Sequence, residues 1–416
     1  MDSESTFSRR EFLRTLAVAG AGLYLVRLPL TAAVPYQKKE SKAYQMKYRL
    51  LGRTGLNVSV IGLGCEGFSG KSAQELGHEL DFAQEHGINF IDLYASDPQL
   101  RSNLGKALKG RRKKFLIQGH ICSTWENGQY LRTRDVNKTK AAFRDLLQRL
   151  STDYVDIGMI HYVDDVDDFH TVFDGEIIRL VNQYKREGQI RYIGISSHNT
   201  QVARMAVETG LVDVLMFSLN PAYDMMPDPQ HKERQLLDPQ RKALYELCAR
   251  TNVGIDVMKA FGGGNLLSDK NSPFGKALTP AQCIEYALSR PGVASVMCGC
   301  NGLEQMQQSL DWCTATAAQK DYAATLATAA GYSWKGQCMY CGHCAPCVKN
   351  IDIASVNKYL NLALAGEQIP ETVRDHYKLL AHHAGECVEC GACMKRCPFE
   401  VNIIAQMRKA KKVFGY

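Results

Sequence analysis

Eight of the 15 cysteines of this 416-residue chain fall into two short runs near its C-terminal end. The first run has the spacing CxxCxxCxxC and the second has CxxCxxCxxxCP; they consist of Cys338, Cys341, Cys344 and Cys347, and of Cys387, Cys390, Cys393 and Cys397. Such spacings let one tight loop direct three thiolates to an iron–sulfur cube, while a more distant cysteine completes the set. We therefore expect two [4Fe-4S] clusters. The alternative, a zinc ribbon, needs four ligands per site without the extra CxxC repetition.

The second run matches the spacing of bacterial ferredoxins, in which the fourth cysteine of each run binds the other cluster. By that pattern Cys397 joins the first group and Cys347 the second. The first run departs from the pattern, because two residues rather than three precede Cys347 and Val348 stands where proline is usual, so the exchange of ligands stays open. Residues 353–365 and 372–382 between the runs have helical periodicity, which predicts a small, mainly helical ferredoxin-like module that carries one electron at a time.

The first residues predict an export signal. Ser8-Arg9-Arg10-Glu11-Phe12-Leu13-Arg14 precedes an apolar run over 16–26 and small residues at 31–33, which is typical of a twin-arginine signal over residues 1–33. The apolar run is well short of the roughly 20 residues that span a bilayer. A disordered basic leader is the alternative, and cleavage after Ala33 stays open. Because the twin-arginine route carries folded proteins, we expect a periplasmic protein, or one on the outer face of the cytoplasmic membrane, that meets the twin-arginine translocase during export.

Composition narrows the class of partner. Hydrophobic residues make up 45% and charged residues 22% of the chain, as in soluble globular proteins. The net charge of +7 is modest for this length, and the basic stretch 408–412 is interpreted as a solvated helix end. We expect no nucleic-acid partner.

Between Val58 and Cys313, apolar strand-like runs alternate with amphipathic helical segments. The runs are VSVIGLG, INFIDLY, KFLIQGH, YVDIGMIH, IRYIGIS, VDVLMFSL, VGIDVM and VASVMCG. Eight such units predict an α/β fold, a (β/α)8 TIM barrel over residues 46–313, then a connecting helix over 314–331 and the cysteine module over 332–416. No GxGxxG motif follows the first run, which disfavours an open Rossmann sheet. In such a barrel the chemistry lies where the strands end.

Several of these runs resemble the successive motifs of aldo-keto reductases. They are YRLLGRTGLNVSVIGLGC, GINFIDLY, DYVDIGMIH, EGQIRYIGISSHN, MKAFGGGNL and GVASVMCGCNGLEQ, in register from Lys47 to about Cys313. The resemblance extends to a branch with a C-terminal iron–sulfur domain. It implies hydride transfer between NADPH and a small carbonyl substrate, helped by a tyrosine, a lysine, an aspartate and a histidine.

Only half of that catalytic set is matched. Asp92 and His161 stand at the positions of the aspartate and the histidine, whereas the tyrosine position holds Asp97 and the lysine position holds His120. Tyr94, two residues after Asp92, is a candidate replacement, and both histidines are candidate proton donors. Two other interpretations stay open: inherited packing groups, and a divalent metal held by these histidines and carboxylates.

The resemblance also implies a nucleotide site. Candidate residues for it are Ser196, Ser197, Asn199, Asn220, Lys259, Gly263, Gly264, Gly299 and Asn301. The alternative is that the glycines serve turns and the polar residues cap helices. No basic residue stands in CGCNGLEQMQQ to meet a 2′-phosphate, so a preference for NADP over NAD is not supported, and NAD(P)H is a candidate cofactor beside the clusters.

The sequence is consistent with two functions. The first is an exported oxidoreductase that couples a redox step in the barrel to electron transfer through the clusters, with a redox protein or small electron carrier as its partner. The second is a catalytically degenerate barrel that acts as an electron-transfer or docking subunit of a larger redox complex. The acidic run over 164–169 is interpreted as a solvated loop.

Overall fold

The computed structural model describes residues 44–227, 229–230, 235–326, 336, 338, 343–364, 369, 371–397 and 400–416. The predicted signal over 1–33, Cys341 and the last residues of the predicted connecting helix lie outside the described residues. Within the described ranges, no helix combines the length and the apolar character needed to cross a bilayer.

Eight parallel strands close into a barrel in chain order, as the sequence predicts. They are β3 (Ile61–Gly64), β4 (Phe90–Leu93), β5 (Leu116–Ile121), β8 (Val155–Ile160), β9 (Ile190–Ser197), β10 (Val214–Ser218), β13 (Gly254–Met258) and β14 (Val293–Cys298). Most of their residues are buried, because helices cover the outer face and side chains fill the interior. Gly194 has no room for a side chain, since a Cβ there would lie 2.5 Å from the Met159 side chain.

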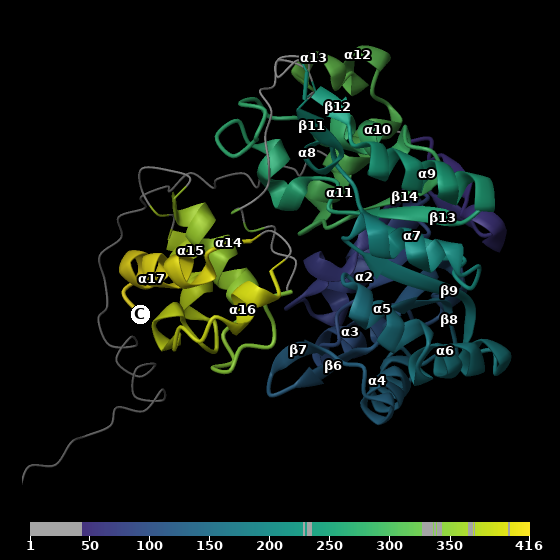
Figure 1. The fold of residues 1–416 in the computed structure, drawn as a ribbon, viewed down its shortest axis with the longest axis horizontal. Helices are drawn as coiled ribbons and strands as arrows, with labels where there is room; N and C mark the ends of the chain where they lie inside the picture. Colours follow the sequence, from purple (N-terminus) through teal and green to yellow (C-terminus); the bar gives the residue numbers. More distant parts are fainter. Residues whose placement is uncertain are drawn as a thin grey trace, which may run out of the picture. The chain divides into compact units, whose positions relative to one another are not determined.

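The helices of the barrel follow the strands and surround them (Figure 1). They are α2 (Ala73–Glu85), α3 (Pro98–Ala107), α4 (Val136–Arg149), α5 (Val166–Phe173), α6 (Glu176–Arg186), α7 (Thr200–Glu208), α8 (Pro221–Asp224), α9 (Pro239–Thr251), α10 (Pro280–Leu288) and α11 (Leu303–Leu310). Side-chain caps begin most of them; Ser72, for example, forms a capping box with Glu75 at the start of α2.

Three antiparallel hairpins accompany the barrel. The strands are β1 (Tyr48–Leu50) with β2 (Asn57–Ser59), β6 (Ser123–Glu126) with β7 (Gln129–Arg132), and β11 (Met225–Pro227) with β12 (Gln235–Leu237). The β6–β7 hairpin lies between β5 and α4 and turns at Asn127-Gly128, where both residues have positive φ, 53° and 74°. Asn-Gly is the favoured pair for such a two-residue turn, and this turn brings Tyr130 back toward the barrel.

After the barrel come short helices and then a small helical region. The short elements are η6 (Asp311–Cys313), α12 (Ala317–Lys320) and α13 (Ala323–Leu326), and the helical region has α14 (Ile353–Leu364), α15 (Glu371–Lys378), η7 (Ala384–Glu386), α16 (Ala392–Lys395) and α17 (Ile403–Phe414). Val356, Leu360, Tyr377 and Met407 form the centre of a separate hydrophobic core. The described cysteines of the two runs lie in or against this core, except Cys390.

Candidate functional site

A pocket of about 550 Å³ opens at the carboxyl ends of the barrel strands, where barrel enzymes place their chemistry. One part of its wall is formed by ionisable and aromatic side chains from the ends of three neighbouring strands: Asp92, Tyr94, His120, His161 and Tyr162. The sequence predicted four of these five as catalytic candidates. The volume is in the range of small-molecule sites.

Four side chains form a continuous hydrogen-bonded chain at this wall. The His120 Nε2 atom lies 2.9 Å from Asp92 Oδ1, and His120 Nδ1 lies 2.7 Å from His161 Nδ1. Nε2 of His161 is hydrogen-bonded to the hydroxyl of Tyr130. His120 stands at the position of the family's lysine and makes the contact to the aspartate that the resemblance assigns to that lysine.

The directions of these hydrogen bonds follow from the chemistry of the end groups. A carboxylate only accepts, so His120 places its N–H on Nε2 and leaves Nδ1 as an acceptor. His161 then donates from Nδ1 and accepts the Tyr130 proton at Nε2, if both rings are neutral. Burial, and next the charge of His120, hold the pKa of His161 well below its usual value, and burial raises the pKa of Tyr130 well above its own. Each hydrogen bond between these four side chains is thus donated in the same direction, from Tyr130 toward Asp92.

The inner end of the chain continues into the barrel. Gln118 Nε2 donates to Asp92 Oδ1 at 2.9 Å and to Asp256 Oδ2 at 3.0 Å. Burial, followed by the nearby charge of Asp92, raises the pKa of Asp256 well above its usual value. Asp256 therefore holds a proton more readily than an ordinary carboxyl group does.

Tyr94 and Asp97 have different roles in the structure. Tyr94 lines the pocket, and its ring lies parallel to that of His161 with centroids 6.5 Å apart. Burial and then the charge of Glu66 raise its pKa well above the usual value, so its hydroxyl keeps its proton. Asp97 does not line the pocket; its carboxylate caps α3 by accepting from the N–H groups of Gln99 and Leu100. The geometry supports Tyr94 as a catalytic candidate and gives Asp97 a structural role.

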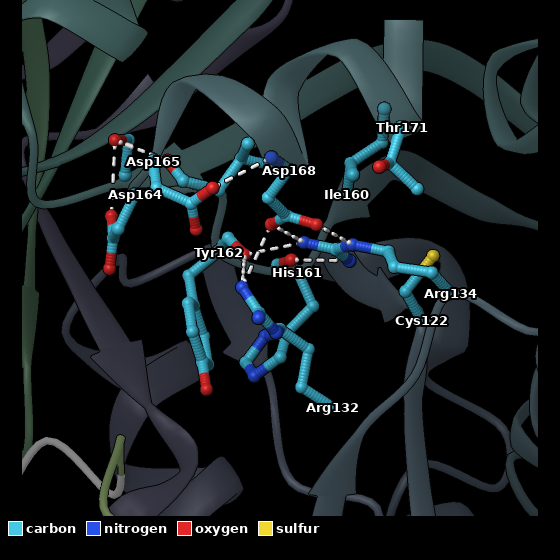
Figure 2. Close-up of polar contacts among 12 residues, drawn as sticks. Cys122, Arg132, Arg134, Ile160, His161, Tyr162, Asp164, Asp165, Asp168 and Thr171 are labelled. Atoms are coloured by element: carbon cyan, nitrogen blue, oxygen red, sulfur yellow. Dashed lines mark hydrogen bonds and ion pairs between the residues drawn. The ribbon is translucent and has the colours of Figure 1, made fainter. Parts of the chain in front are cut away.

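A cluster of ion pairs fixes the backbone at His161 (Figure 2). Arg134 makes two hydrogen bonds to the carboxylate of Asp168, of 2.8 and 2.7 Å, and Arg132 adds a third of 2.8 Å. The same Arg134 guanidinium donates to the carbonyl oxygens of His161 and Tyr162 at 3.0 and 2.7 Å. The segment that carries Tyr130 is thereby tied to the end of β8 that carries His161.

A second part of the pocket wall matches the predicted nucleotide side. Lys259, Gly263, Gly264, Gly299, Asn301 and Ser196 all line it. Gly262, Gly263 and Gly264 have φ values of 58°, 66° and 90°, and a Cβ on Gly264 would meet only open space, so the backbone is bare on this side. Lys259 itself has a φ of 63°, a costly conformation for a residue with a side chain and one that often occurs at functional sites.

These residues fit the diphosphate of a nicotinamide dinucleotide, because a lysine and bare glycine backbone can approach phosphate closely. Lys358 of α14 also lines the pocket, a second cation that the barrel sequence alone did not indicate. Ser197, Asn199 and Asn220, in contrast, do not line it. Their polar atoms serve the chain: Ser197 donates to the Val163 carbonyl, while Asn199 and Asn220 cap α7 and α8.

The acidic run over 164–169 is not a solvated loop, so that interpretation was wrong. Asp165 caps α5, and the Asp168 side chain is only 9% exposed against the two arginines. Asp164 accepts hydrogen bonds from His198 and His343. Burial opposes ionisation of Asp164, but the two imidazoles outweigh it and keep its pKa well below the usual value.

A second cavity lies among the cysteines. Its lining includes Cys347 of the first run together with Cys387, Cys390 and Cys393 of the second. None of these four cysteines forms a disulfide. The fourth cysteine of the first run therefore lines the same cavity as the first three of the second.

Tyr130 and His343 are the main site residues that the sequence did not indicate. The Asn127-Gly128 pair was a usable signal for the hairpin, because this pair between alternating residues favours a tight turn. For His343 no local signal existed, since it stands within the first cysteine run and reaches the barrel only in the folded chain.

Comparison with known proteins identifies the family of the barrel. The profile of the Aldo/keto reductase family matches residues 60–277. The Bacillus subtilis (strain 168) protein named "Uncharacterized oxidoreductase YqkF" is 28% identical over 64% of this chain and 90% of its own length. L-galactose dehydrogenase of Arabidopsis thaliana is 24% identical over 64% of this chain and 88% of its own.

Among solved structures, the holo form of the aldo-keto reductase AKR11C1 from Bacillus halodurans is 26% identical, with a TM-score of 0.56, over 69% of this chain and 98% of its own. The family match spans half of the chain and the strands that bear Asp92, His120 and His161. The chain belongs to the aldo/keto reductase family and is an oxidoreductase of that type.

Proposed function

We propose that this protein is an exported oxidoreductase that interconverts a small carbonyl compound and its alcohol at the barrel mouth and exchanges electrons through two [4Fe-4S] clusters. The observation that carries the proposal is the hydrogen-bonded chain from Tyr130 through His161 and His120 to Asp92, on the wall of a pocket that also presents Lys259. A barrel kept only as a docking body has no need for this buried polar chain, which is costly to bury unless every member is paired.

Each residue of the site has a role in the proposed reaction that follows from its position. Tyr94 faces the pocket with a protonated hydroxyl, so it is the group that donates a hydrogen bond to the substrate oxygen. His161 lies parallel to it and is held in one tautomer by Tyr130 on one side and His120 on the other. Asp92 orients His120 by accepting a hydrogen bond from its Nε2 atom. Tyr130 does not line the pocket and is a positioning residue.

A nicotinamide dinucleotide fits the wall formed by Lys259 and the glycines, and when bound it supplies the hydride. The two lysines at the pocket, Lys259 and Lys358, balance its phosphates. Ser196, buried at the end of β9 and on the pocket wall, stands where the resemblance expects a residue facing the nicotinamide.

The cysteine cavity supports the cluster half of the proposal. Cys347, Cys387, Cys390 and Cys393 fit one cubane, and Cys338, Cys341, Cys344 and Cys397 remain for the other, in line with the crossed ligation of two-cluster ferredoxins. When bound, such clusters would pass single electrons, so the two electrons of one hydride would leave in two one-electron steps to a redox protein or small carrier, with release of one proton. The twin-arginine sequence supports export in a folded, loaded state.

The test starts from anaerobically purified full-length protein, with extraction of bound nucleotide and turnover assays using NADPH, NADH and small aldehydes. His161→Ala and Tyr94→Phe should each lower the rate by roughly 10²- to 10⁴-fold, the usual contribution of a positioned acid or base. Tyr130→Phe should shift the pH profile of the rate. Asp97→Ala is the control, because it removes only a helix cap.

The second candidate, a docking or electron-transfer subunit, is favoured by the replacement of the family's tyrosine position by Asp97. It would be supported by protein that carries both clusters but neither binds nucleotide nor turns over. Turnover that is unchanged in His161→Ala would overturn the role given to the chain.

A further inference from the structure

Three side chains meet outside the hydrogen-bonded chain described above. Asp164 follows β8, His198 follows β9 and His343 stands between two cysteines of the first run. The His343 Nε2 atom lies 2.5 Å, and the His198 Nδ1 atom 3.1 Å, from the same oxygen, Oδ2 of Asp164. One ligand-type atom from each of the three side chains lies within 4.8 Å of the others.

The cluster is buried and its members are held in place. The side chains of Asp164, His198 and His343 are 16%, 8% and 4% exposed. The other carboxylate oxygen, Oδ1, accepts from the backbone N–H of His198 at 2.7 Å. The ring of His343 stacks on Tyr162 with centroids 3.9 Å apart. These contacts orient the carboxylate and one imidazole, as the residues around metal ligands do.

One nitrogen of the cluster, Nε2 of His198, is buried and makes no hydrogen bond within the part of the chain that the structure describes. A buried polar atom without a partner is uncommon in proteins and often contacts an ordered water. Because Nδ1 is the atom of His198 that lies beside Asp164, the ion would bind at Nδ1, and Nε2 on the other side of the ring stays available for a water or a ligand. His198 and His343 both line the large pocket, so a group bound between them is open to a ligand there.

We propose that Asp164, His198 and His343 bind a divalent transition metal of the zinc class at the barrel mouth. Two imidazoles and one carboxylate are a common donor set for catalytic zinc, in which a fourth position stays free for water or substrate. Zinc–nitrogen and zinc–oxygen bonds of about 2.0–2.1 Å keep tetrahedral ligand atoms roughly 3.3 Å apart. The present separations of 2.5 and 3.1 Å need to widen by less than ~1 Å to reach this geometry.

The site is distinct from the iron–sulfur ligands and from the hydrogen-bonded chain of Tyr130, His161, His120 and Asp92. It does not depend on the proposed function, because a barrel without turnover can still bind the metal. Its open position faces the pocket, so the ligand it would take is a small molecule with a carbonyl, carboxylate or thiolate group.

The experiment uses the full-length protein, purified anaerobically, and Zn²⁺ alone as the probe. After iron and sulfide have been quantified, equilibrium dialysis and calorimetry measure zinc binding, and thermal melts with and without Zn²⁺ measure its effect on stability. We expect one zinc per chain bound in addition to the iron. His198→Ala and Asp164→Asn should each weaken binding by ~100-fold or more.

His343→Ala is a second test, and His170→Ala is the control, because His170 pairs with Asp174 on an exposed part of α5. X-ray absorption spectroscopy at the zinc edge then identifies the atoms that bind the metal. We expect only nitrogen and oxygen ligands at about 2.0–2.1 Å. Sulfur ligands at about 2.3 Å would mean that zinc occupies the cysteines and would overturn the site. Absence of zinc binding by protein with intact clusters would also overturn it and leave the three residues as a hydrogen-bonded contact.

Discussion

The barrel and the cysteine region differ in how they are held together. The hydrophobic core of the barrel draws on every barrel strand and most of the helices, so its site residues lie on a frame that extensive apolar burial stabilises. The core of the cysteine region is small, and Cys347, Cys387 and Cys397, which form no disulfide, pack against it. Small domains with so little apolar burial usually need a metal or disulfides. The barrel thus positions its site, whereas the cysteine region is expected to depend on what its site binds.

The largest effect should come from Cys393→Ser. Cys393 is buried beside Cys387 and Cys347, and losing it should remove one of the two proposed clusters, so that iron falls to about half, four atoms of the eight that the proposal requires. Because metal binding in such sites is folding free energy, α14–α17 should exchange amide hydrogens much faster while the barrel strands stay protected. Iron and sulfide analysis and hydrogen exchange measure both.

Cys313→Ser, a change in a partly buried thiol outside the two runs, is the matched control. If Cys393→Ser kept its full iron content, or if the native protein contained zinc in place of iron, the contrast between the two regions would fail.

Asp168→Asn should weaken the barrel alone. It removes the carboxylate shared by Arg132 and Arg134, and it leaves the Arg134 guanidinium, whose side chain is 14% exposed, without its ionic partner. Breaking a buried pair in this way costs about 3–5 kcal/mol of unfolding free energy. Chemical denaturation followed by barrel fluorescence measures it, with Asp174→Asn at an exposed pair as the control. A loss below ~1 kcal/mol would show that the cluster is not needed to hold the end of β8.

A smaller effect should appear in the pH dependence of barrel stability. The pKa of His161 is well below its usual value of about 6.5, so the unfolded chain binds the proton more readily. The contribution of His161 to the free energy of unfolding is therefore fully present above about pH 6.5. It is lost as the pH falls toward the pKa of the folded state, and the free energy of unfolding then changes by up to ~1.4 kcal/mol per pH unit. Chemical denaturation at pH 7.5, 6.0 and 5.0 gives the free energy of unfolding at each pH. This free energy should depend less steeply on pH in His161→Gln than in His170→Gln. Equal slopes would contradict the assignment.

The fold was predictable because its signals are local and repeated. Each barrel strand is a short apolar run with a helical segment after it, and all eight runs became strands. Asp92, His120 and His161 were also predictable, since the carboxyl ends of neighbouring parallel strands meet at one face. Asp97 looked equivalent to them by alignment, but it begins a helix, and an aspartate at that place satisfies backbone N–H groups instead.

The residues missed are those brought in by long-range packing. Tyr130 reaches His161 through a hairpin inserted after β5, and Asp164 is buried by His343, which is 179 positions away in the sequence. Periodicity reports which face of an element is buried, but it does not report which distant loop covers the end of that element. For the same reason the acidic run looked solvated.

The β6–β7 hairpin constrains its own length. The Nε2 atom of Gln129 donates a hydrogen bond of 2.7 Å to Oδ1 of Asn350, a residue three positions after Cys347. The next residue of the strand, Tyr130, contacts His161. Since neighbouring residues of a strand point to opposite faces, a shift of one position in this strand would exchange the two contacts and satisfy neither. Insertions at the Asn127-Gly128 tip should therefore be accepted only in pairs.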